Sequence, residues 1–333
     1  MASTGNSWFL FVTGMVRALE NRMLGRGNIE GMLRAETGDD VLGLLRNTRY
    51  STFPDLSREP FVYESLVKSA REQLFNFIDK YSGDTGAGYI FRADYDYHNM
   101  KILLRRKITG EEKGDLLSGL GSVSTELMEE IFEHELYDLL PAVMRDSVSA
   151  AIEAYFTHKR LALINPVFDT FLFRDLLESE ASGKSWLIRN YIRRRIDAAN
   201  IMTILRMNGS EAGDDSMEYL FIDGGFIDTG LFLRGDKEYL KLLQEIAVKY
   251  DLTGLNASLI DKAGMLYAAE RECRAMMMRE LETADFMITG VEPLFAYGCR
   301  VDDELKYIGM IFSSKYPEFN RGIIETMLAR GGD

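Results

Sequence analysis

Few residues of the sequence have the types and spacing that catalysis requires. Gly183-Lys184-Ser185 matches the end of the phosphate-binding pattern GxxxxGK[ST], but Glu178 occupies the position of its first glycine. No strand pattern precedes the segment, so it is predicted to be a turn between two helices. The chain also lacks the HExxH, GxSxG and GxGxxG patterns. Its histidines are His98, His134 and His158, and none follows a glutamate by three residues, as a di-iron bundle requires.

Two charged clusters remain as candidate binding groups. Segment 129–135 contains four glutamates and His134, a pattern that is more often a solvated helix face than a metal site. Arginines at 189 and 193–195 form a basic helical patch, which is either solvated or in contact with an acidic partner protein. An enzyme is therefore disfavoured, and the sequence predicts no catalytic residue, no cofactor and no bound metal.

Composition excludes further classes of protein. The 333 residues carry 39 Lys and Arg against 52 Asp and Glu, a formal charge of −13, which disfavours binding to nucleic acid. Two cysteines, Cys273 and Cys299, are too few for a disulfide framework and fit a reducing compartment. The apolar run that begins at Trp8 stops at Arg17, whereas a membrane span needs about 20 residues. We therefore expect a soluble cytosolic protein with no direct membrane insertion.

The clearest pattern is an internal repeat. The first copy carries Asp96, Asn99 and Arg105, and the second carries Asp197, Asn200 and Arg206 at the same offsets. Downstream, the segments 121–127 and 225–231 also match, and each is predicted to begin a helix, with an N-cap at Ser124 or Asp228. A fainter third copy begins at Glu304.

The repeated polar residues are predicted to hold helices in place. Asp96 and Asn99 share one helix face with apolar residues, as do Asp197 and Asn200. An asparagine on an apolar face must have its amide hydrogen-bonded, so we expect each amide to bond the backbone of a neighbouring segment. A ligand site is the less favoured alternative, because recurrence in two units indicates shared construction.

Helical spacing dominates the rest of the chain, and strict alternation of apolar and polar residues is almost absent. Helices are predicted over 125–140, 171–177, 186–206, 239–250 and 259–281. Together with the repeats, this predicts an all-α protein of three related helical units of about 100 residues each. The approximate boundaries are 1–115, 116–222 and 223–333.

Several segments together resemble one known family of the V-type/A-type ATPase (ATP synthase), whose members are named C in archaea and bacteria and d in vacuolar pumps. The similar segments are 16–24, 40–45, Thr48-Arg49-Tyr50, the two Asp-x-x-Asn repeats, 290–297 with Glu292, Pro293 and Tyr297, then Glu304-Leu305 and Lys315. They extend over effectively the whole chain. The sequence departs from the family at Gly309, where a basic residue is usual, and at Ser314, where a glycine is usual.

The resemblance implies a mechanical function. The family's fold is three similar helical domains arranged as a funnel. Its members are non-catalytic components of the central stalk, which connect the D and F subunits of the shaft to the membrane ring of proteolipids and transmit torque. A peripheral position on the cytoplasmic face of the membrane is implied as well.

Two other functions stay open from the residues alone. One is a helical-repeat adaptor unrelated to any ATPase, and the other is a helical enzyme that uses the carboxylates of 129–135. The sequence leaves open the direction of the ATP reaction, the transported ion and the oligomeric state.

Overall fold

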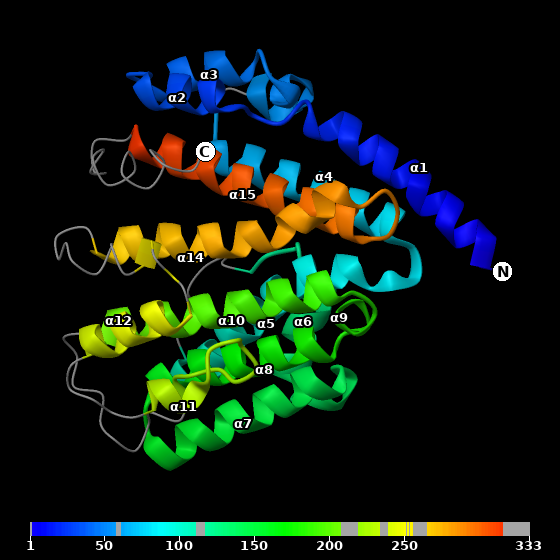
Figure 1. The fold of residues 1–333 in the computed structure, drawn as a ribbon. Helices are drawn as coiled ribbons and strands as arrows, with labels where there is room; N and C mark the ends of the chain where they lie inside the picture. The colour runs from blue at the N-terminus through cyan, green and yellow to red at the C-terminus, as the bar shows by residue number, and fades with distance from the viewer. Residues whose placement is uncertain are drawn as a thin grey trace. The chain divides into compact units, whose positions relative to one another are not determined.

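The computed structural model describes residues 2–57, 61–110, 117–207, 219–233, 239–250, 252, 254–255 and 265–315. Within these residues every regular element is a helix and none is a strand (Figure 1). The all-α class predicted from the sequence is confirmed.

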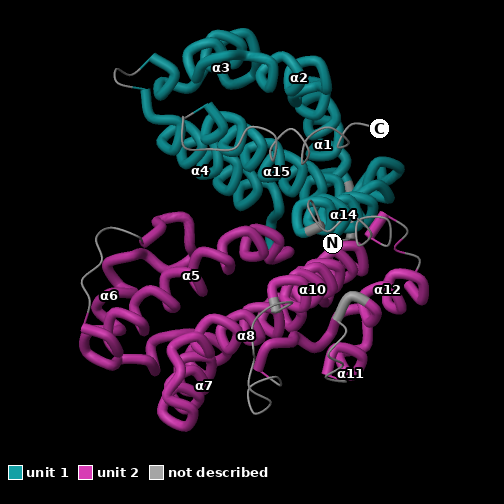
Figure 2. Tube along the Cα trace, turned by 90° about the vertical axis from the view of Figure 1, so that its left-hand side faces the viewer, with its two compact units in different colours: residues 1–84, 263–333 teal, residues 85–262 magenta. Residues whose placement is uncertain are grey.

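The chain divides into two compact units (Figure 2). Unit 1 comprises residues 1–84 and 263–333, and unit 2 comprises residues 85–262. Both copies of the Asp-x-x-Asn repeat therefore lie in unit 2. The division into three units with boundaries near residues 115 and 222, and their arrangement as a funnel, stay predictions.

Unit 1 is formed by both ends of the chain. Its α-helices are α1 (Ala2–Glu20), α2 (Arg26–Arg34), α3 (Gly38–Leu45), α4 (Tyr63–Ser82), α14 (Met265–Leu281) and α15 (Glu292–Ser314). Its short 3-10 helices are η1 (Arg49–Thr52), η2 (Pro54–Ser57) and η7 (Glu282–Phe286).

Helix α15 is the centre of unit 1. It packs along α4 and α1 and is buried on most of its circumference, as the full burial of Phe295, Leu305 and Ile308 shows (Figure 1). Pro293 lies in its first turn, where a missing N–H costs no helical hydrogen bond. Each large apolar side chain buried in this way contributes about 1.5–3 kcal/mol relative to an exposed one.

Unit 2 contains eight of the labelled α-helices. They are α5 (Ala87–Thr109), α6 (Thr125–Glu133), α7 (Ala142–His158), α8 (Ile164–Glu178), α9 (Glu180–Lys184), α10 (Trp186–Met207), α11 (Thr229–Phe232) and α12 (Tyr239–Lys249). Two 3-10 helices, η4 (Tyr137–Leu139) and η5 (Leu161–Leu163), connect them, and η3 (Gly83–Thr85) precedes α5. Helix α8 packs against α7, α5 and α10. Ile188, Ile192 and Ile196 of α10 are fully buried at helical spacing.

One predicted helix is shorter than its apolar spacing indicates. The face at Met128, Phe132, Leu136 and Leu139 predicted one helix over 125–140, but α6 ends at Glu133. Glu135 has φ of 59°, and the Leu136 N–H donates to the Ile131 carbonyl at 2.9 Å. This hydrogen bond closes a Schellman-type end, so Leu136 and Leu139 lie beyond the helix and are exposed.

The other helix predictions agree more closely with the structure. Segments 171–177, 186–206 and 239–250 lie in α8, α10 and α12, although Tyr250 itself follows the end of α12. The first residues of the predicted helix 259–281 are outside the described part of the chain, and the remainder forms α14. No helix in the described part has the length and apolar character that a membrane span requires.

Candidate functional site

The two repeated asparagines bond the main chain in the same way. The Asn99 amide donates to the Ser118 carbonyl at 2.9 Å and accepts from the Ser118 N–H at 2.8 Å. The Asn200 amide donates to the Ile222 carbonyl at 2.8 Å and accepts from the Ile222 N–H at 2.9 Å. Both side chains are fully buried. Each amide therefore supplies the hydrogen-bond partners that the main chain of the neighbouring segment needs at Ser118 or Ile222.

The two repeated aspartates bond the same segments a few residues further on. Asp96 accepts hydrogen bonds from the N–H groups of Ser122 and Val123, each at 3.0 Å. Asp197 accepts from the Ile227 N–H at 2.9 Å. Immediately afterwards α6 and α11 begin, and the predicted N-caps are confirmed: Ser124 accepts from Leu127 and Asp228 from Gly230. Each Asp-x-x-Asn pair thus fixes the entry to the next helix.

A glycine lies against each of these carboxylates. A Cβ atom on Gly121 would lie inside van der Waals contact with an oxygen of Asp96, and one on Gly225 would do the same with Asp197. The glycines allow the backbone to approach the carboxyl group closely enough for its N–H groups to donate. They belong to the repeat for the same physical reason as the aspartates.

The Asp197 carboxyl group is the more strongly perturbed of the two. Burial raises its pKa to about 6, although the Ile227 N–H and the charge of Arg194 act in the opposite direction. Its Oδ2 atom lies 3.6 Å from Arg194 and accepts no hydrogen bond from the described residues. Burial also raises the pKa of Asp96, and its hydrogen bonds from Ser122 and Val123 lower it.

The arginines of the repeat are not equivalent in the structure. Arg105, in the last turns of α5, donates to the Leu161 carbonyl at 3.4 Å. Arg206, in the last turn of α10, is exposed and has no hydrogen-bond or ionic partner among the described residues. Only the aspartate and asparagine of each copy therefore have corresponding contacts.

The third, fainter copy forms a comparable bond through Glu304 of α15. Its carboxylate accepts from the Leu24 N–H at 2.6 Å and from the Tyr50 hydroxyl at 2.6 Å. Arg49 lies 3.8 Å away and donates to the Tyr297 hydroxyl at 3.4 Å. Burial raises the pKa of Glu304, while the Tyr50 hydrogen bond and the Arg49 charge lower it. As in unit 2, the bonded segment directly precedes a helix, here α2, but it comes from the N-terminal part of the chain.

The remaining residues of the C-terminal motif lie at the ends of α15. Glu292 begins the helix beside Gly290, which has φ of +106° and no room for a Cβ atom next to the Glu292 carboxylate. Lys315 follows the helix and donates to the Leu33 and Ala35 carbonyls, each at 2.8 Å, at the C-terminal end of α2. A cation there also interacts favourably with the helix dipole. Both departures from the family lie in α15, Gly309 inside the helix and Ser314 as its last residue.

The charged candidates outside the repeats take part in local structure. The acidic side chains of 129–135 are exposed, and Glu129 and Glu135 form ion pairs with Arg106 and Lys107. The described residues contain no group of three or more His, Cys, Asp or Glu side chains that could hold a metal ion. Gly183 and Lys184 form the end of α9 and only Ser185 connects it to α10, so the predicted turn between helices is limited to Ser185.

The arginine patch is largely used inside unit 2. Arg193 donates to the Gly224 and Gly225 carbonyls at 3.2 and 2.9 Å, and its guanidinium group lies 4.0 Å from the centroid of the Phe226 ring. Arg195 forms two hydrogen bonds with Asp94, at 2.7 and 3.0 Å. Arg193 thus positions the segment that the Asp197 carboxylate also bonds, and Arg195 joins α10 to α5.

Two further features were missed by reasoning from sequence. Asp175 of α8 accepts from the Tyr89 and Tyr97 hydroxyls at 2.5 and 3.1 Å, and burial raises its pKa. Its partners on α5 are too far away in sequence for any spacing rule to pair them. The second feature is a pocket in unit 1, for which the only sequence signal is the Thr48-Arg49-Tyr50 motif.

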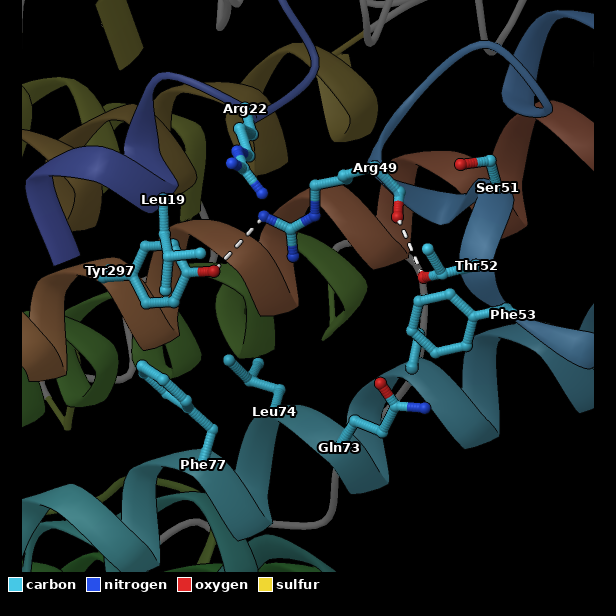
Figure 3. Close-up of a pocket in the computed structure, with 11 residues that line it drawn as sticks. Leu19, Arg22, Arg49, Ser51, Thr52, Phe53, Gln73, Leu74, Phe77 and Tyr297 are labelled. Carbon is cyan, nitrogen blue, oxygen red and sulfur yellow. Dashed lines mark hydrogen bonds between the residues drawn. The ribbon is translucent and has the colours of Figure 1, made fainter. Parts of the chain in front are cut away.

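The pocket has a volume of about 450 Å³ and lies between η1, α4, α15 and the end of α1 (Figure 3). The described residues that line it include two arginines and no acidic side chain. Its lining is Leu19, Arg22, Arg49, Ser51, Thr52, Phe53, Ala70, Gln73, Leu74, Phe77 and Tyr297. Arg49, which donates to the Tyr297 hydroxyl in this pocket, is also the cation that lies 3.8 Å from the Glu304 carboxylate.

Comparison with known proteins matches most of the chain to one family. The sequence model of the ATP synthase (C/AC39) subunit matches residues 12–327. The C subunit of the A-type ATP synthase of Methanosphaera stadtmanae is 25% identical over 264 residues, which cover 75% of this chain and 65% of the relative. The C subunit of the V-type ATP synthase of Thermus thermophilus is 26% identical over 209 residues, 61% of each chain. These two matches span less than two thirds of the relatives. The corresponding A-type protein of Thermoplasma acidophilum is 22% identical over 97% of this chain and 98% of its own length.

Proposed function

Because the chain belongs to the ATP synthase (C/AC39) subunit family, we propose that it is a non-catalytic subunit of a rotary A/V-type ATPase. In this proposal it is part of the central stalk, between the D and F subunits of the shaft and the membrane ring of proteolipids. It turns with them and transmits torque between the ATP reaction and ion movement. It is bound peripherally at the cytoplasmic face of the membrane.

The observation that carries the proposal is the family match over residues 12–327, nearly the whole chain. The contacts of the repeat give it physical support. A coupling piece must transmit force without yielding, and packed protein interiors have low compressibility. The bonds of Asn99, Asn200 and Glu304 fix buried helices to the segments that pass them. Such bonds suit a body whose function depends on its stiffness.

The test is assembly. The purified chain is mixed with the detergent-solubilised proteolipid ring and with the D and F subunits of the same cell, and the mixture is separated by size. We expect this chain, D, F and the ring to elute as one particle. Elution of the ring and the D–F pair without this chain, at concentrations where each component is folded, would refute the proposed position.

The same experiment separates the alternatives. An adaptor protein unrelated to the ATPase would leave the ring and shaft unbound and would capture a peptide ligand instead. An enzyme that uses the carboxylates of 129–135 would lose its activity when Glu129 and Glu133 are changed to Gln, whereas the proposed stalk component would assemble unchanged because these side chains are exposed.

A further inference from the structure

The pocket of unit 1 has an unbalanced charge. Figure 3 shows the guanidinium groups of Arg22 and Arg49 pointing toward one another within it. Arg49 has a nearby carboxylate, Glu304, at 3.8 Å. Arg22 has no ion pair or hydrogen bond from its side chain within the described residues, and the nearby Glu20 is paired with Arg17 and Arg300. In a chain of net charge −13, the described residues that line this cavity include two cations and no acid.

The polar side chains of the pocket offer hydrogen-bond donors to an anion. The Tyr297 hydroxyl accepts from Arg49, which leaves its own O–H group to donate. The Ser51 hydroxyl and the Gln73 amide also line the pocket. Arg22 has its whole guanidinium fork available. A carboxylate can be satisfied by one such fork, whereas the three outer oxygens of a phosphate can accept from two guanidinium groups and hydroxyls together.

Much of the remaining lining is apolar. Hydrocarbon surface comes from Leu19 of α1, from Leu74 and Phe77 of α4, and from Phe53, which follows η1 (Figure 3). The volume of about 450 Å³ lies within the range of sites for small organic molecules, which combine apolar walls with a few convergent polar groups. A free inorganic anion would leave this apolar part unfilled.

We propose that the pocket binds a phosphate monoester, with the phosphate between Arg22 and Arg49 and an apolar body against Leu74 and Phe77. The ester has two possible sources, a soluble aryl phosphate or the phosphate headgroup of a lipid. The proposal is independent of the torque-transmitting function, because it is tested on the isolated chain.

The experiment measures the binding of three probes to the isolated chain at pH 7.5 and low salt. The probes are inorganic phosphate, phenyl phosphate and a short-chain phosphatidic acid below its micelle concentration. We expect saturable binding of at least one organic ester, tighter than that of inorganic phosphate and weaker at high salt. A stronger response to phenyl phosphate identifies a soluble ester as the source, and a stronger response to the phosphatidic acid identifies a lipid.

Variants test where the probe binds. Arg22→Gln should weaken binding by about tenfold, since it removes one charge-assisted donor from an exposed side chain that supports no other contact. Gln73→Glu is nearly isosteric and adds a negative charge to the lining of the pocket, so it should weaken the binding of an anion. Arg189→Gln makes the same charge change on an exposed side chain of unit 2 and should bind like the wild type.

Three results would overturn the proposal. One is the absence of binding by any of the esters up to about 10 mM, a concentration that detects even weak sites. Another is equal binding by Arg22→Gln and wild type. The third is an equal loss in Arg189→Gln, which would indicate a general charge effect. Arg22 and Gln73 are both exposed, so we expect their replacement to leave the fold intact. Thermal unfolding of each variant checks this.

Discussion

The carboxylate of Glu304 in α15 accepts a hydrogen bond of 2.6 Å from the main-chain N–H of Leu24, 280 residues earlier in the chain. In unit 2, Asn99 and Asn200 bond segments that follow them by 19 and 22 residues. The third copy thus forms its hydrogen bond with the N-terminal segment, whereas the first two copies bond segments that follow them in the chain. Together with the packing of α15 along α4 and α1, this bond joins residues 1–84 and 263–333 into one unit.

Removing the Glu304 carboxylate should destabilise unit 1. Glu304→Ala leaves the Tyr50 hydroxyl and the Leu24 N–H without an acceptor and Arg49 without its counter-charge, a loss of about 3–5 kcal/mol. Glu304→Gln keeps one acceptor oxygen and should cost less. The measurement is urea unfolding followed by Trp8 fluorescence in a Trp186→Phe background, because Trp8 lies in unit 1.

The matched control for this prediction is Lys306→Ala on the same helix. Its side chain is 64% exposed and pairs with Asp302, so it should change the free energy of unfolding by at most about 1 kcal/mol. Equal effects of Glu304→Ala and Lys306→Ala would show that the Leu24 bond does not hold the N-terminal segment.

Each asparagine of the repeat should stabilise unit 2 through two hydrogen bonds. Asn200→Ala leaves both polar groups of the Ile222 main chain unpaired in the interior, and Asn99→Ala does the same at Ser118. We expect losses of about 2–3 kcal/mol each in the free energy of unfolding. Trp186 fluorescence in a Trp8→Phe background reports on unit 2. The control is Asn47→Ala, which removes an exposed amide of unit 1. It should change the free energy of unfolding by at most about 0.5 kcal/mol, as measured through Trp8. If Asn200→Ala were as mild as Asn47→Ala, the buried amide would have no structural role.

Adding a methyl group to either repeated glycine should force the nearby carboxylate to move. Gly121→Ala and Gly225→Ala are expected to lose about 1–3 kcal/mol through overpacking against Asp96 and Asp197. Gly119→Ala is the control, because a Cβ atom there meets nothing within 4 Å. Thermal unfolding of the three variants gives the comparison. A melting temperature for Gly121→Ala that matches that of Gly119→Ala would contradict the close approach.

The raised pKa of Asp197 predicts a pH dependence of defined sign. The folded state, with a pKa of about 6, binds the proton more tightly than the unfolded state, with a value near 3.8. Its contribution to stability is therefore fully present below about pH 3.8 and is lost as the pH rises through 6. Relative to Asp197→Asn, the wild type should become less stable by about 2 kcal/mol between pH 4 and pH 7. A difference between the two proteins that does not change with pH would contradict the burial of a titrating carboxyl group.

The sequence predicts the helices well where apolar spacing and local end signals agree. The bounds of α10 follow from its apolar spacing, and Ser124 and Asp228 mark the starts of α6 and α11. The prediction fails at Leu136 and Leu139, because a Schellman-type end stops α6 although the apolar spacing continues. Apolar spacing shows which residues share a helix face, but it contains no signal for the left-handed backbone conformation of Glu135 that ends the helix.

The sequence predicts that the buried polar side chains of the repeat form hydrogen bonds with the main chain. It does not identify the residues that they bond. A buried asparagine needs a partner, and the matching downstream segments 121–127 and 225–231 are near the ones that supply it. The partners of Glu304 could not be predicted, because Leu24 and Tyr50 come from the other end of the chain. The pocket was missed for the same reason, since Arg22, Gln73 and Tyr297 meet only in the folded unit.

The most direct test of the coupling function measures ATP-driven ion uptake in vesicles that contain the rotary ATPase of the same cell, assembled with and without this chain. The proposal predicts that ATP hydrolysis drives uptake only when the chain is present, and that without it hydrolysis continues while uptake is lost. Uptake at the same rate per ATP in the assembly that lacks the chain would contradict it.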